Sequence, residues 1–294
     1  MKIGLFSQPE TVAKAVEHAH LFHDAGFHSM WVPQIMGIDA ITALTVVAHE
    51  VPQIELGTAV VPTFLRHPVM MAAQARTLQQ AAGGRFSLGI GLSHQMMIEG
   101  LLGIPWEKPV RHLREYLDIL LPLLHGEPAD ATGETLSAHL ALDIPDSTPV
   151  PVLVAALGTQ MLTLTGRRAE GTVTWMTGPT TIGEHIVPTI TAAAADAGRP
   201  APRVVCALPV CVTDDEATAR ANAAEQFQIY GYLPSYRAML DREGVDGPAD
   251  VALVGSAAVV RAGIEKVREA GATDFVGVPY DNREATMEVL AEFL

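Results

Sequence analysis

The sequence predicts a single (β/α)8 barrel, in which eight parallel strands alternate with helices. Its 294 residues accommodate this fold, which typically needs roughly 250 residues. Short apolar runs of strand length alternate with segments of helical periodicity along the whole chain. A glycine that closes a helix just before such a run recurs, and this junction is the αβ half of a βαβ unit. It occurs at Gly26, Gly83, Gly171, Gly198 and Gly271.

Eight segments have the composition expected of the barrel strands. They are residues 3–7, 28–33, 54–61, 86–91, 151–156, 171–176, 203–212 and 274–279. The surplus length includes two insertions at the carboxyl ends of strands, near 93–110 and 227–250, and both are lid candidates. A third long connection, 126–150, is expected at the opposite end. We therefore expect residues 1–294 to form one domain with two rim insertions.

Residues 54–94 are the most informative segment because they read as strand, helix and strand. The run IELGTAVV is rich in β-branched residues and stops at Pro62, which cannot continue a strand ladder. Pro68 suits a first helical turn, and Gly83-Gly84 suits a helix end. A right-handed crossover places the ends of both strands on one rim. Ligands of parallel α/β proteins bind at that rim.

Helix starts are predicted from capping residues. Capping boxes are expected at Ser7-Gln8-Pro9-Glu10 and at Thr181-Ile182-Gly183-Glu184, since each pairs a hydroxyl residue with a glutamate three positions later. Asp39 and Asp214 are expected to cap two further helices.

The composition excludes several classes of protein. Apolar residues make up 49% of the chain and charged residues 18%, which argues against disorder. A formal net charge of −14 argues against a nucleic-acid partner, because phosphate binding needs a basic surface. No apolar run reaches membrane-spanning length and no secretory signal is evident. Cys206 and Cys211 lie on opposite sides of one predicted strand and cannot pair with each other. We expect a cytoplasmic protein.

The glycine motifs allow more than one structural interpretation. Gly89-Ile90-Gly91 lacks the third glycine of a dinucleotide fingerprint, since His94 stands there. A tight strand exit with close backbone approach is the favoured reading. Gly158 and Gly178 each precede a predicted helix. Such helix starts are either phosphate sites or ordinary glycine turns.

Only a few polar side chains are candidates for a catalytic role. His18, His20 and His23 lack the spacing of a zinc site on a helix, so no metal site is predicted. No lysine ends a strand, which argues against Schiff-base chemistry. The polar residues at predicted strand ends are Gln34, Thr63, Ser93 and His94. Among them only His94 titrates near neutral pH.

Three motifs give the chain a family resemblance. They are Arg66-His67-Pro68, the run AQARTL at 73–78, and GRFSLGIG at 84–91. They resemble the luciferase-like monooxygenase superfamily, and in particular its coenzyme F420-dependent oxidoreductases from actinobacteria. The resemblance extends over essentially the whole chain, and it implies a barrel of the bacterial luciferase-like type. It also implies that a deazaflavin or flavin lies across the carboxyl-end rim.

The resemblance assigns roles to individual residues. Family members often hold a non-prolyl cis peptide bond at the position of Ala59-Val60, beneath the central ring. Gln34 lies where relatives carry an aspartate near the reactive edge of the cofactor, and His94 where some use a glutamate for proton transfer. We expect His94, helped by Ser93, to be catalytic. The expected cofactor-binding residues are Gln34, Ala59, Val60, Val61, Thr63, Leu92, Ser93, Gly158, Thr159 and Met161, the last three at the cofactor phosphate.

The expected activity is hydride transfer between coenzyme F420 and a small organic substrate. Gln34-Ile35 replaces the Asp-His pair of the family's sugar-phosphate dehydrogenases, so a reductase is favoured. An apolar substrate is suggested by Phe64, Met96, Met97, Trp106, Trp175 and Met176. Two alternatives stay open: an FMN-dependent monooxygenase served by a separate flavin reductase, and a cofactor-binding protein without turnover. The family resemblance also implies a homodimer.

Overall fold

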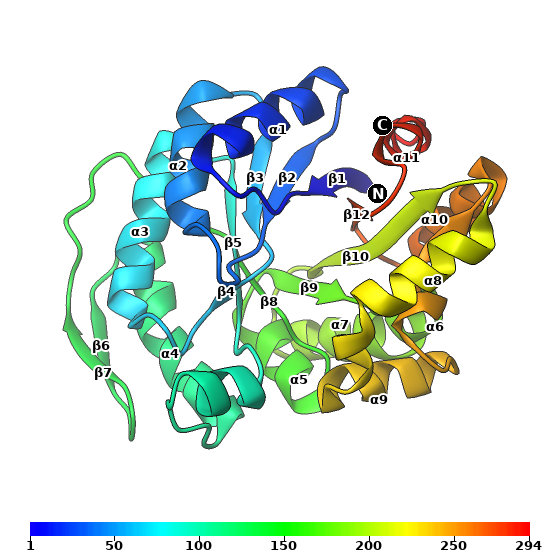
Figure 1. The fold of residues 1–294 in the computed structure, drawn as a ribbon. Helices are drawn as coiled ribbons and strands as arrows, with labels where there is room; N and C mark the ends of the chain where they lie inside the picture. The colour runs from blue at the N-terminus through cyan, green and yellow to red at the C-terminus, as the bar shows by residue number, and fades with distance from the viewer. The chain divides into compact units, whose positions relative to one another are not determined.

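The computed structural model describes all 294 residues, and they divide into two compact units. The first unit comprises Met1–Ser7, Phe22–Trp31 and Ala156–Leu294. The second comprises Gln8–Leu21 and Val32–Ala155. Figure 1 shows the course of the chain through both. The expectation of one domain stays a prediction.

The first unit is built on a parallel sheet. Strand β10 pairs with β9 on one side and with β12 on the other, β12 pairs with β1, and β1 pairs with β2. The short strand β11 pairs with the carboxyl end of β10. The strands are β1 (Lys2–Phe6), β2 (Ser29–Val32), β9 (Gly171–Trp175), β10 (Arg203–Val212), β11 (Leu253–Gly255) and β12 (Asp274–Pro279).

Helices follow these strands in the chain. They are α5 (Thr159–Arg168), α6 (Pro179–Thr181), η2 (Ile182–Ile186), α7 (Val187–Asp196), α8 (Glu216–Gln226), η3 (Gln228–Gly231), α9 (Pro234–Glu243), η4 (Pro248–Asp250), α10 (Ala257–Glu269) and α11 (Arg283–Ala291). Helix α1 (Val12–Asp24) belongs partly to each unit. Gly166 lets α5 approach α7 closely, because a Cβ there would lie 2.4 Å from the Ile190 carbonyl oxygen.

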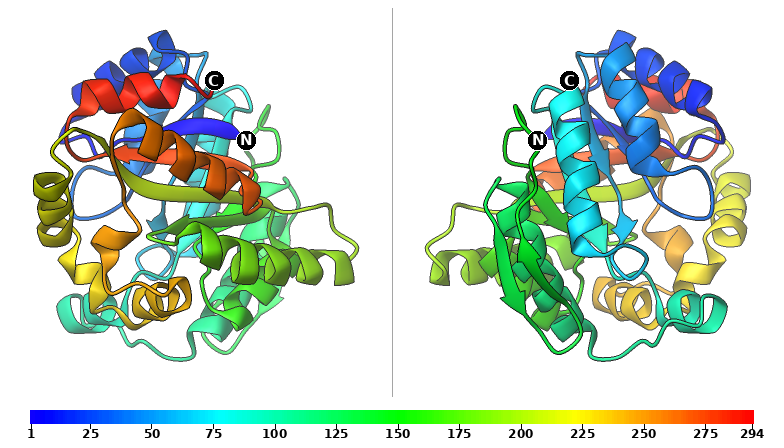
Figure 2. Two further views of the ribbon diagram at one scale, coloured as in Figure 1. Left: turned by 90° about the vertical axis from the view of Figure 1, so that its right-hand side faces the viewer. Right: turned by 90° about the vertical axis from the view of Figure 1, so that its left-hand side faces the viewer.

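The second unit contains a parallel sheet and an antiparallel hairpin. Strand β5 pairs with β3, β4 and β8, all in parallel, and β6 pairs with β7. The strands are β3 (Glu55–Thr58), β4 (Val61–Pro62), β5 (Phe86–Gly91), β6 (Ala129–Thr132), β7 (Ser137–Leu140) and β8 (Val152–Val154). The helices are α2 (Ala40–Glu50), α3 (Pro68–Ala81), η1 (Met96–Leu101) and α4 (Pro109–Leu124). Helices α2 and α3 lie side by side (Figure 2).

The residues that begin and end α3 act as the sequence predicts. Pro68 is in the first turn of α3, and the helix ends before Gly83 and Gly84, whose φ angles are +57° and +89°. These left-handed conformations favour glycine. Helix α4 also begins with a proline, and its buried side chains include Leu113, Tyr116, Leu117 and Leu120. This apolar face packs the helix against the core of the second unit.

Each of the eight expected strands forms. Seven correspond to single strands, and the segment 54–61 divides into β3 and the first residue of β4. The backbone between them is interrupted at a cis peptide bond joining Ala59 and Val60. The hairpin β6–β7 within 126–150 is an addition that the sequence reading missed. The chain therefore has the strand and helix order of a (β/α)8 barrel.

The predicted helix caps are confirmed in one case and wrong in three. Asp39 accepts a hydrogen bond of 2.8 Å from the Thr42 backbone N–H and caps α2. Asp215, one residue beyond the predicted Asp214, caps α8 through the Thr218 N–H at 3.1 Å.

The two predicted capping boxes do not start helices. Helix α1 begins at Val12, after the box at 7–10, and the Thr11 hydroxyl accepts from the Lys14 N–H at 3.2 Å. Helix α6 begins at Pro179, before the box at 181–184. Instead, a carboxylate from α9 accepts hydrogen bonds from the first turn of α6. Local sequence rules cannot predict such a contact, because the two segments are far apart in the chain. No helix of the protein is both long and apolar enough to cross a membrane.

Candidate functional site

The carboxyl end of the second unit's sheet places the predicted ring-binding residues together. Its central feature is the cis peptide bond between Ala59 and Val60, at the position that the family resemblance indicates. The Ala59 N–H donates to the Val32 carbonyl at 2.9 Å, and the Gln34 N–H donates to the Val60 carbonyl at 3.2 Å. The backbone on both sides of this bond is therefore held by the segment 32–34.

Two glycines allow β5 to lie close to this segment. A Cβ at Gly89 would lie 1.9 Å from the Thr58 carbonyl oxygen, and one at Gly91 would lie 2.7 Å from Cγ2 of Val60. The Thr58 hydroxyl also accepts from the Gly89 N–H and donates to its carbonyl, both at 2.8 Å. The Gly89-Ile90-Gly91 run is thus the tight strand exit that the sequence favoured, and that prediction is confirmed.

Leu92, Ser93 and His94 follow β5 directly. Ser93 has a φ of 66°, a left-handed conformation that turns the chain away from the strand. The His94 carbonyl accepts from the Met97 and Ile98 N–H groups, each at 2.9 Å, and so starts η1. Burial lowers the pKa of the His94 imidazole, which keeps it neutral at pH 7. A neutral imidazole has one N–H to donate and one nitrogen to accept.

Thr63 lies beside the end of β5, and its side chain meets a histidine that the sequence reading missed. The Thr63 N–H donates to the Gly91 carbonyl at 2.8 Å. Its buried hydroxyl oxygen is 3.0 Å from Nε2 of His112, a residue of α4. The apolar pattern of α4 contained a signal for this residue. His112 stands one turn before Tyr116, which is fully buried, so its side chain is on the inward-facing side of the helix.

Gln34 has a structural task in addition to its predicted one. Its side-chain oxygen accepts from the Ala40 N–H at 2.8 Å, at the start of α2, and its amide nitrogen donates to the Ile35 carbonyl at 3.3 Å. Contact with a cofactor has to use the remaining hydrogen-bonding capacity of this amide. Its role at the reactive edge stays a prediction.

In the first unit, the two glycine loops that the sequence left open differ clearly. The start of α6 after Gly178 is filled by the Glu243 carboxylate, which accepts from the Thr180 and Thr181 N–H groups at 3.1 and 2.7 Å. A Cβ at Gly178 would lie 2.4 Å from this carboxyl group. This loop is therefore an internally satisfied turn.

The start of α5 after Gly158 has no such side-chain cap. Gly158 has an extended backbone, and the helix begins at Thr159, with Met161 half-buried in its first turn. Backbone N–H groups at a helix start attract anions through their own partial charge and the helix dipole. This helix start therefore suits a phosphate group.

Aromatic side chains stack on one another near strand ends in both units. In the second unit, Phe64 stacks on His112 and on Trp106, with ring centroids 3.9 and 5.0 Å apart and interplanar angles of 4° and 25°. In the first unit, Trp175 stacks on Phe6 at 6.4 Å. Of the residues expected to form an apolar surface, Met176 is fully buried.

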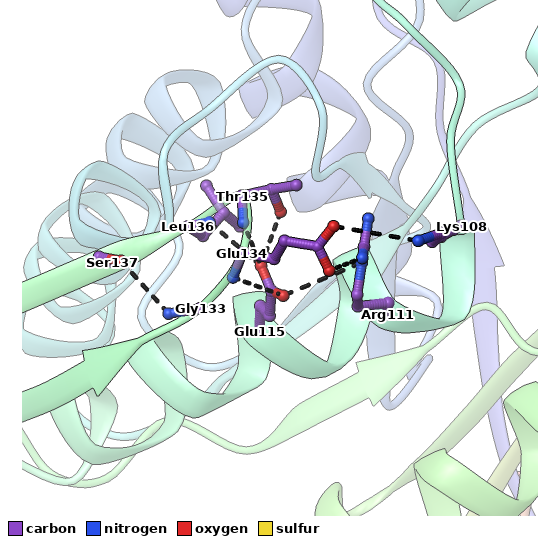
Figure 3. A network of polar contacts seen from close by, with 8 residues as sticks. All are labelled: Lys108, Arg111, Glu115, Gly133, Glu134, Thr135, Leu136 and Ser137. Carbon is purple, nitrogen blue, oxygen red and sulfur yellow. Dashed lines mark hydrogen bonds and ion pairs between the residues drawn. The ribbon is translucent and has the colours of Figure 1, made fainter.

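Helix α4 is fastened to the β6–β7 hairpin by a buried carboxylate (Figure 3). Glu115 accepts hydrogen bonds from the backbone N–H groups of Glu134, Thr135 and Leu136 at 3.0, 2.9 and 3.1 Å. It also accepts the Thr135 hydroxyl at 2.6 Å. This hydroxyl contributes most to lowering the pKa of Glu115, and the backbone bonds add to it. The carboxylate holds the helix that carries His112.

Comparison with known proteins gives consistent results. The luciferase-like monooxygenase family model matches residues 1–274. The chain is 30% identical over 263 residues to 5,10-methylenetetrahydromethanopterin reductase from Methanolobus tindarius, covering 87% of this chain and 79% of that protein. It is 27% identical over 278 residues to a putative coenzyme F420-dependent oxidoreductase from Mycobacterium tuberculosis, with 85% and 76% covered.

Solved structures confirm the predicted fold class. The F420-dependent tetrahydromethanopterin reductase from Methanopyrus kandleri superposes with a TM-score of 0.83 at 22% identity, over 99% of this chain and 97% of that one. An F420-dependent secondary alcohol dehydrogenase in complex with an F420-acetone adduct also gives 0.83, at 18% identity and with 100% and 98% covered. The FMN-bound type II Baeyer-Villiger monooxygenase from Pseudomonas putida gives 0.78, at 18% identity, with 99% and 97% covered. The chain thus has the (β/α)8 barrel of luciferase-like enzymes.

Proposed function

Because the chain belongs to the luciferase-like monooxygenase family, we propose that it is an oxidoreductase that transfers hydride between coenzyme F420 and a small, apolar organic substrate. The observation that carries this proposal is the rim of the second unit. There the cis bond at Ala59-Val60, the bare backbone of Gly91 and the buried Thr63 hydroxyl adjoin one another.

The residues fit a deazaflavin cofactor. Gly91 cannot carry a side chain without displacing Val60, so the end of β5 offers flat backbone to a flat ring. Ala59, Val60, Val61 and Leu92 would contact that ring, and Gln34, Thr63 and Ser93 would meet its polar atoms. In the first unit, Gly158, Thr159 and Met161 would hold a phosphate group. The chain has only 19 lysines and arginines against 33 acidic residues, which makes backbone N–H groups the natural phosphate ligands.

The protein's own chemical contribution is binding, orientation and proton transfer. When bound, the deazaflavin supplies the hydride chemistry. His94 is the proposed proton donor to the substrate, with Ser93 beside it. Burial lowers its pKa, so the neutral imidazole first takes up a proton from solvent at its free ring nitrogen, and the imidazolium formed in this way passes a proton to the substrate and returns to the neutral form.

Binding measurements test the cofactor. Purified protein is titrated separately with F420 and FMN while cofactor fluorescence is followed. Tight F420 binding with FMN binding at least tenfold weaker supports the proposal. The reverse order supports the FMN-dependent monooxygenase, for which the FMN-bound structural relative is the favouring observation. A separate flavin reductase would then be a required partner.

Turnover measurements test the reaction. Reduced F420 is mixed with a panel of enones, imines and quinones, and its oxidation is followed by absorbance. Oxidation that depends on both enzyme and acceptor supports a reductase. F420 binding without oxidation by any acceptor supports a cofactor-binding protein without turnover. Reduction of F420 by glucose 6-phosphate at an enzymatic rate would contradict the proposed direction.

The proposed assembly is a homodimer. Helices α2 and α3 form an apolar groove lined by Ile41, Thr42, Thr45, Val46, Ala73, Gln74 and Thr77. The side-chain oxygen of Gln74 is buried there without a hydrogen-bond partner, although buried amide oxygens normally have one. A second copy of the chain would cover this groove. The proposed location is the cytoplasm, consistent with the free cysteines Cys206 and Cys211.

A further inference from the structure

The Thr63 hydroxyl is a buried polar group at the rim. Its residue is 1% exposed, and its backbone N–H is bonded to Gly91. A hydroxyl has one hydrogen to donate and two lone pairs to accept with. The contact with Nε2 of His112 uses one of these. The direction of that one hydrogen bond therefore decides what Thr63 offers to a ligand.

The His112 ring is held in a fixed orientation. One face stacks on Phe64, at 3.9 Å and nearly parallel, and Tyr116 lies 5.8 Å away at a tilt of 42°. The Tyr116 hydroxyl donates to the Arg66 carbonyl at 3.0 Å, which ties α4 to the loop that carries Thr63. Because the ring cannot turn freely, Nε2 stays directed at Thr63.

The surroundings keep this imidazole neutral. Burial lowers its pKa, and Glu115 on the same helix raises it by a smaller amount. On the loop packed against α4, the charged side chain of Arg66 is paired with Asp39. The hydrogen bond to Thr63 therefore depends on which nitrogen of the neutral ring carries the hydrogen. With the hydrogen on Nδ1, Nε2 accepts from Thr63 and the hydroxyl offers only lone pairs to a ligand. With the hydrogen on Nε2, the Thr63 O–H is free to donate.

We propose that His112 is a positioning residue that donates its Nε2–H to the Thr63 oxygen and so turns the Thr63 O–H toward an acceptor atom of the bound cofactor. This inference rests on the proposed function. The edges of a deazaflavin ring present oxygen and nitrogen lone pairs. A directed hydroxyl donor suits them, whereas a hydroxyl that has given its hydrogen to His112 does not.

Three variants test the binding consequence by F420 fluorescence titration. His112→Phe keeps a ring on Phe64 but removes the donor, and Thr63→Val keeps the shape but removes the hydroxyl. Each should raise the F420 Kd by about fivefold to tenfold, the effect of one hydrogen bond. His112→Gln can still donate to Thr63 and should remain within about twofold of the wild type.

A double variant and a control variant distinguish loss of the His112–Thr63 hydrogen bond from general destabilisation of the protein. His112→Phe combined with Thr63→Val should lose no more than either alone, because both remove the same interaction. His125→Gln is the matched control, since His125 is exposed at the end of the same helix, and it should leave Kd unchanged. Additive losses, or an unchanged Kd in both single variants, would overturn the proposal.

The tautomer is measured directly in the wild type. Nitrogen-15 NMR of histidine-labelled protein, with His112 assigned by its absence in His112→Gln, should show the hydrogen on Nε2. A hydrogen on Nδ1 in the presence of cofactor overturns the inference even if His112→Phe and Thr63→Val do not fold. If the wild type fails to bind F420, the proposed function is wrong. The same spectra recorded with FMN then still decide the role of His112.

Discussion

Replacing Glu115 by glutamine tests how α4, and with it His112, is held in place. In the wild type, one carboxylate oxygen accepts from the Glu134 N–H, and the other accepts from the N–H and hydroxyl of Thr135 and from the Leu136 N–H. A glutamine keeps one acceptor oxygen, and its NH2 group faces an N–H that previously had a partner. The substitution also removes the negative charge.

The expected loss of stability is about 2–3 kcal/mol. Hydrogen bonds to a charged group contribute about 1.5–3 kcal/mol each, against about 0.5–1.5 kcal/mol for neutral ones. One bond is lost and three are weakened, while water at the exposed hairpin turn recovers part of the difference. Unfolding entropy of about 2.1 cal/mol/K per residue gives about 0.6 kcal/mol/K for 294 residues. Tm should therefore fall by about 3–5 °C.

Thermal melts followed by circular dichroism at pH 7 measure this effect. Glu134→Gln is the matched control, because it removes the same charge from the same cluster (Figure 3). The Glu134 side chain is 63% exposed, so its ion pairs with Lys108 and Arg111 are solvated on the Glu134 side, although the Arg111 side chain itself is 20% exposed. Such pairs contribute less than about 1 kcal/mol, so Tm should change by less than about 2 °C. Limited proteolysis should cut the turn at 133–136 faster in Glu115→Gln alone. Equal melting temperatures for the two variants would refute the reasoning.

Four further outcomes are expected. Folding lowers the pKa of Glu115, so the stabilisation it provides is present above the unfolded value of about 4.3 and is lost as the pH falls through the folded value. The free energy of unfolding should therefore fall more steeply with acidification in the wild type than in Glu115→Gln, and equal slopes would contradict this. Gly91→Ala should lower the free energy of unfolding by about 1–3 kcal/mol through overpacking and raise the F420 Kd more than tenfold. At Gly158 a Cβ meets nothing within 4 Å, so Gly158→Ala should fold normally. His94→Ala should lower turnover of reduced F420 about 100-fold with Kd unchanged, and full turnover would exclude it as the proton donor. Val46→Glu should convert the proposed dimer to a monomer in light scattering, and an unaltered mass would exclude the α2–α3 groove as the interface.

Much of the fold follows from local properties of the sequence. Pro68 and Gly83-Gly84 bound α3 because proline and glycine act on their own backbone torsions. The strand exit at Gly89-Ile90-Gly91 is readable for the same reason. The family resemblance located the cis bond at Ala59-Val60, which local patterns do not encode. Capping was predicted less well, since Glu243 replaces the box at Thr181 from a distant helix.

The sequence by itself determined the order of the eight barrel strands and their helices, the rim where ligands are expected to bind and the candidates Thr63 and His94. Only the tertiary structure decided their partners. His112 meets Thr63 across 49 positions, and Glu115 holds a turn about 20 residues away. Hydrogen bonds of this kind depend on which elements pack together, and packing is set by the summed burial of many apolar side chains. The periodicity of a single segment therefore cannot predict which elements pack together.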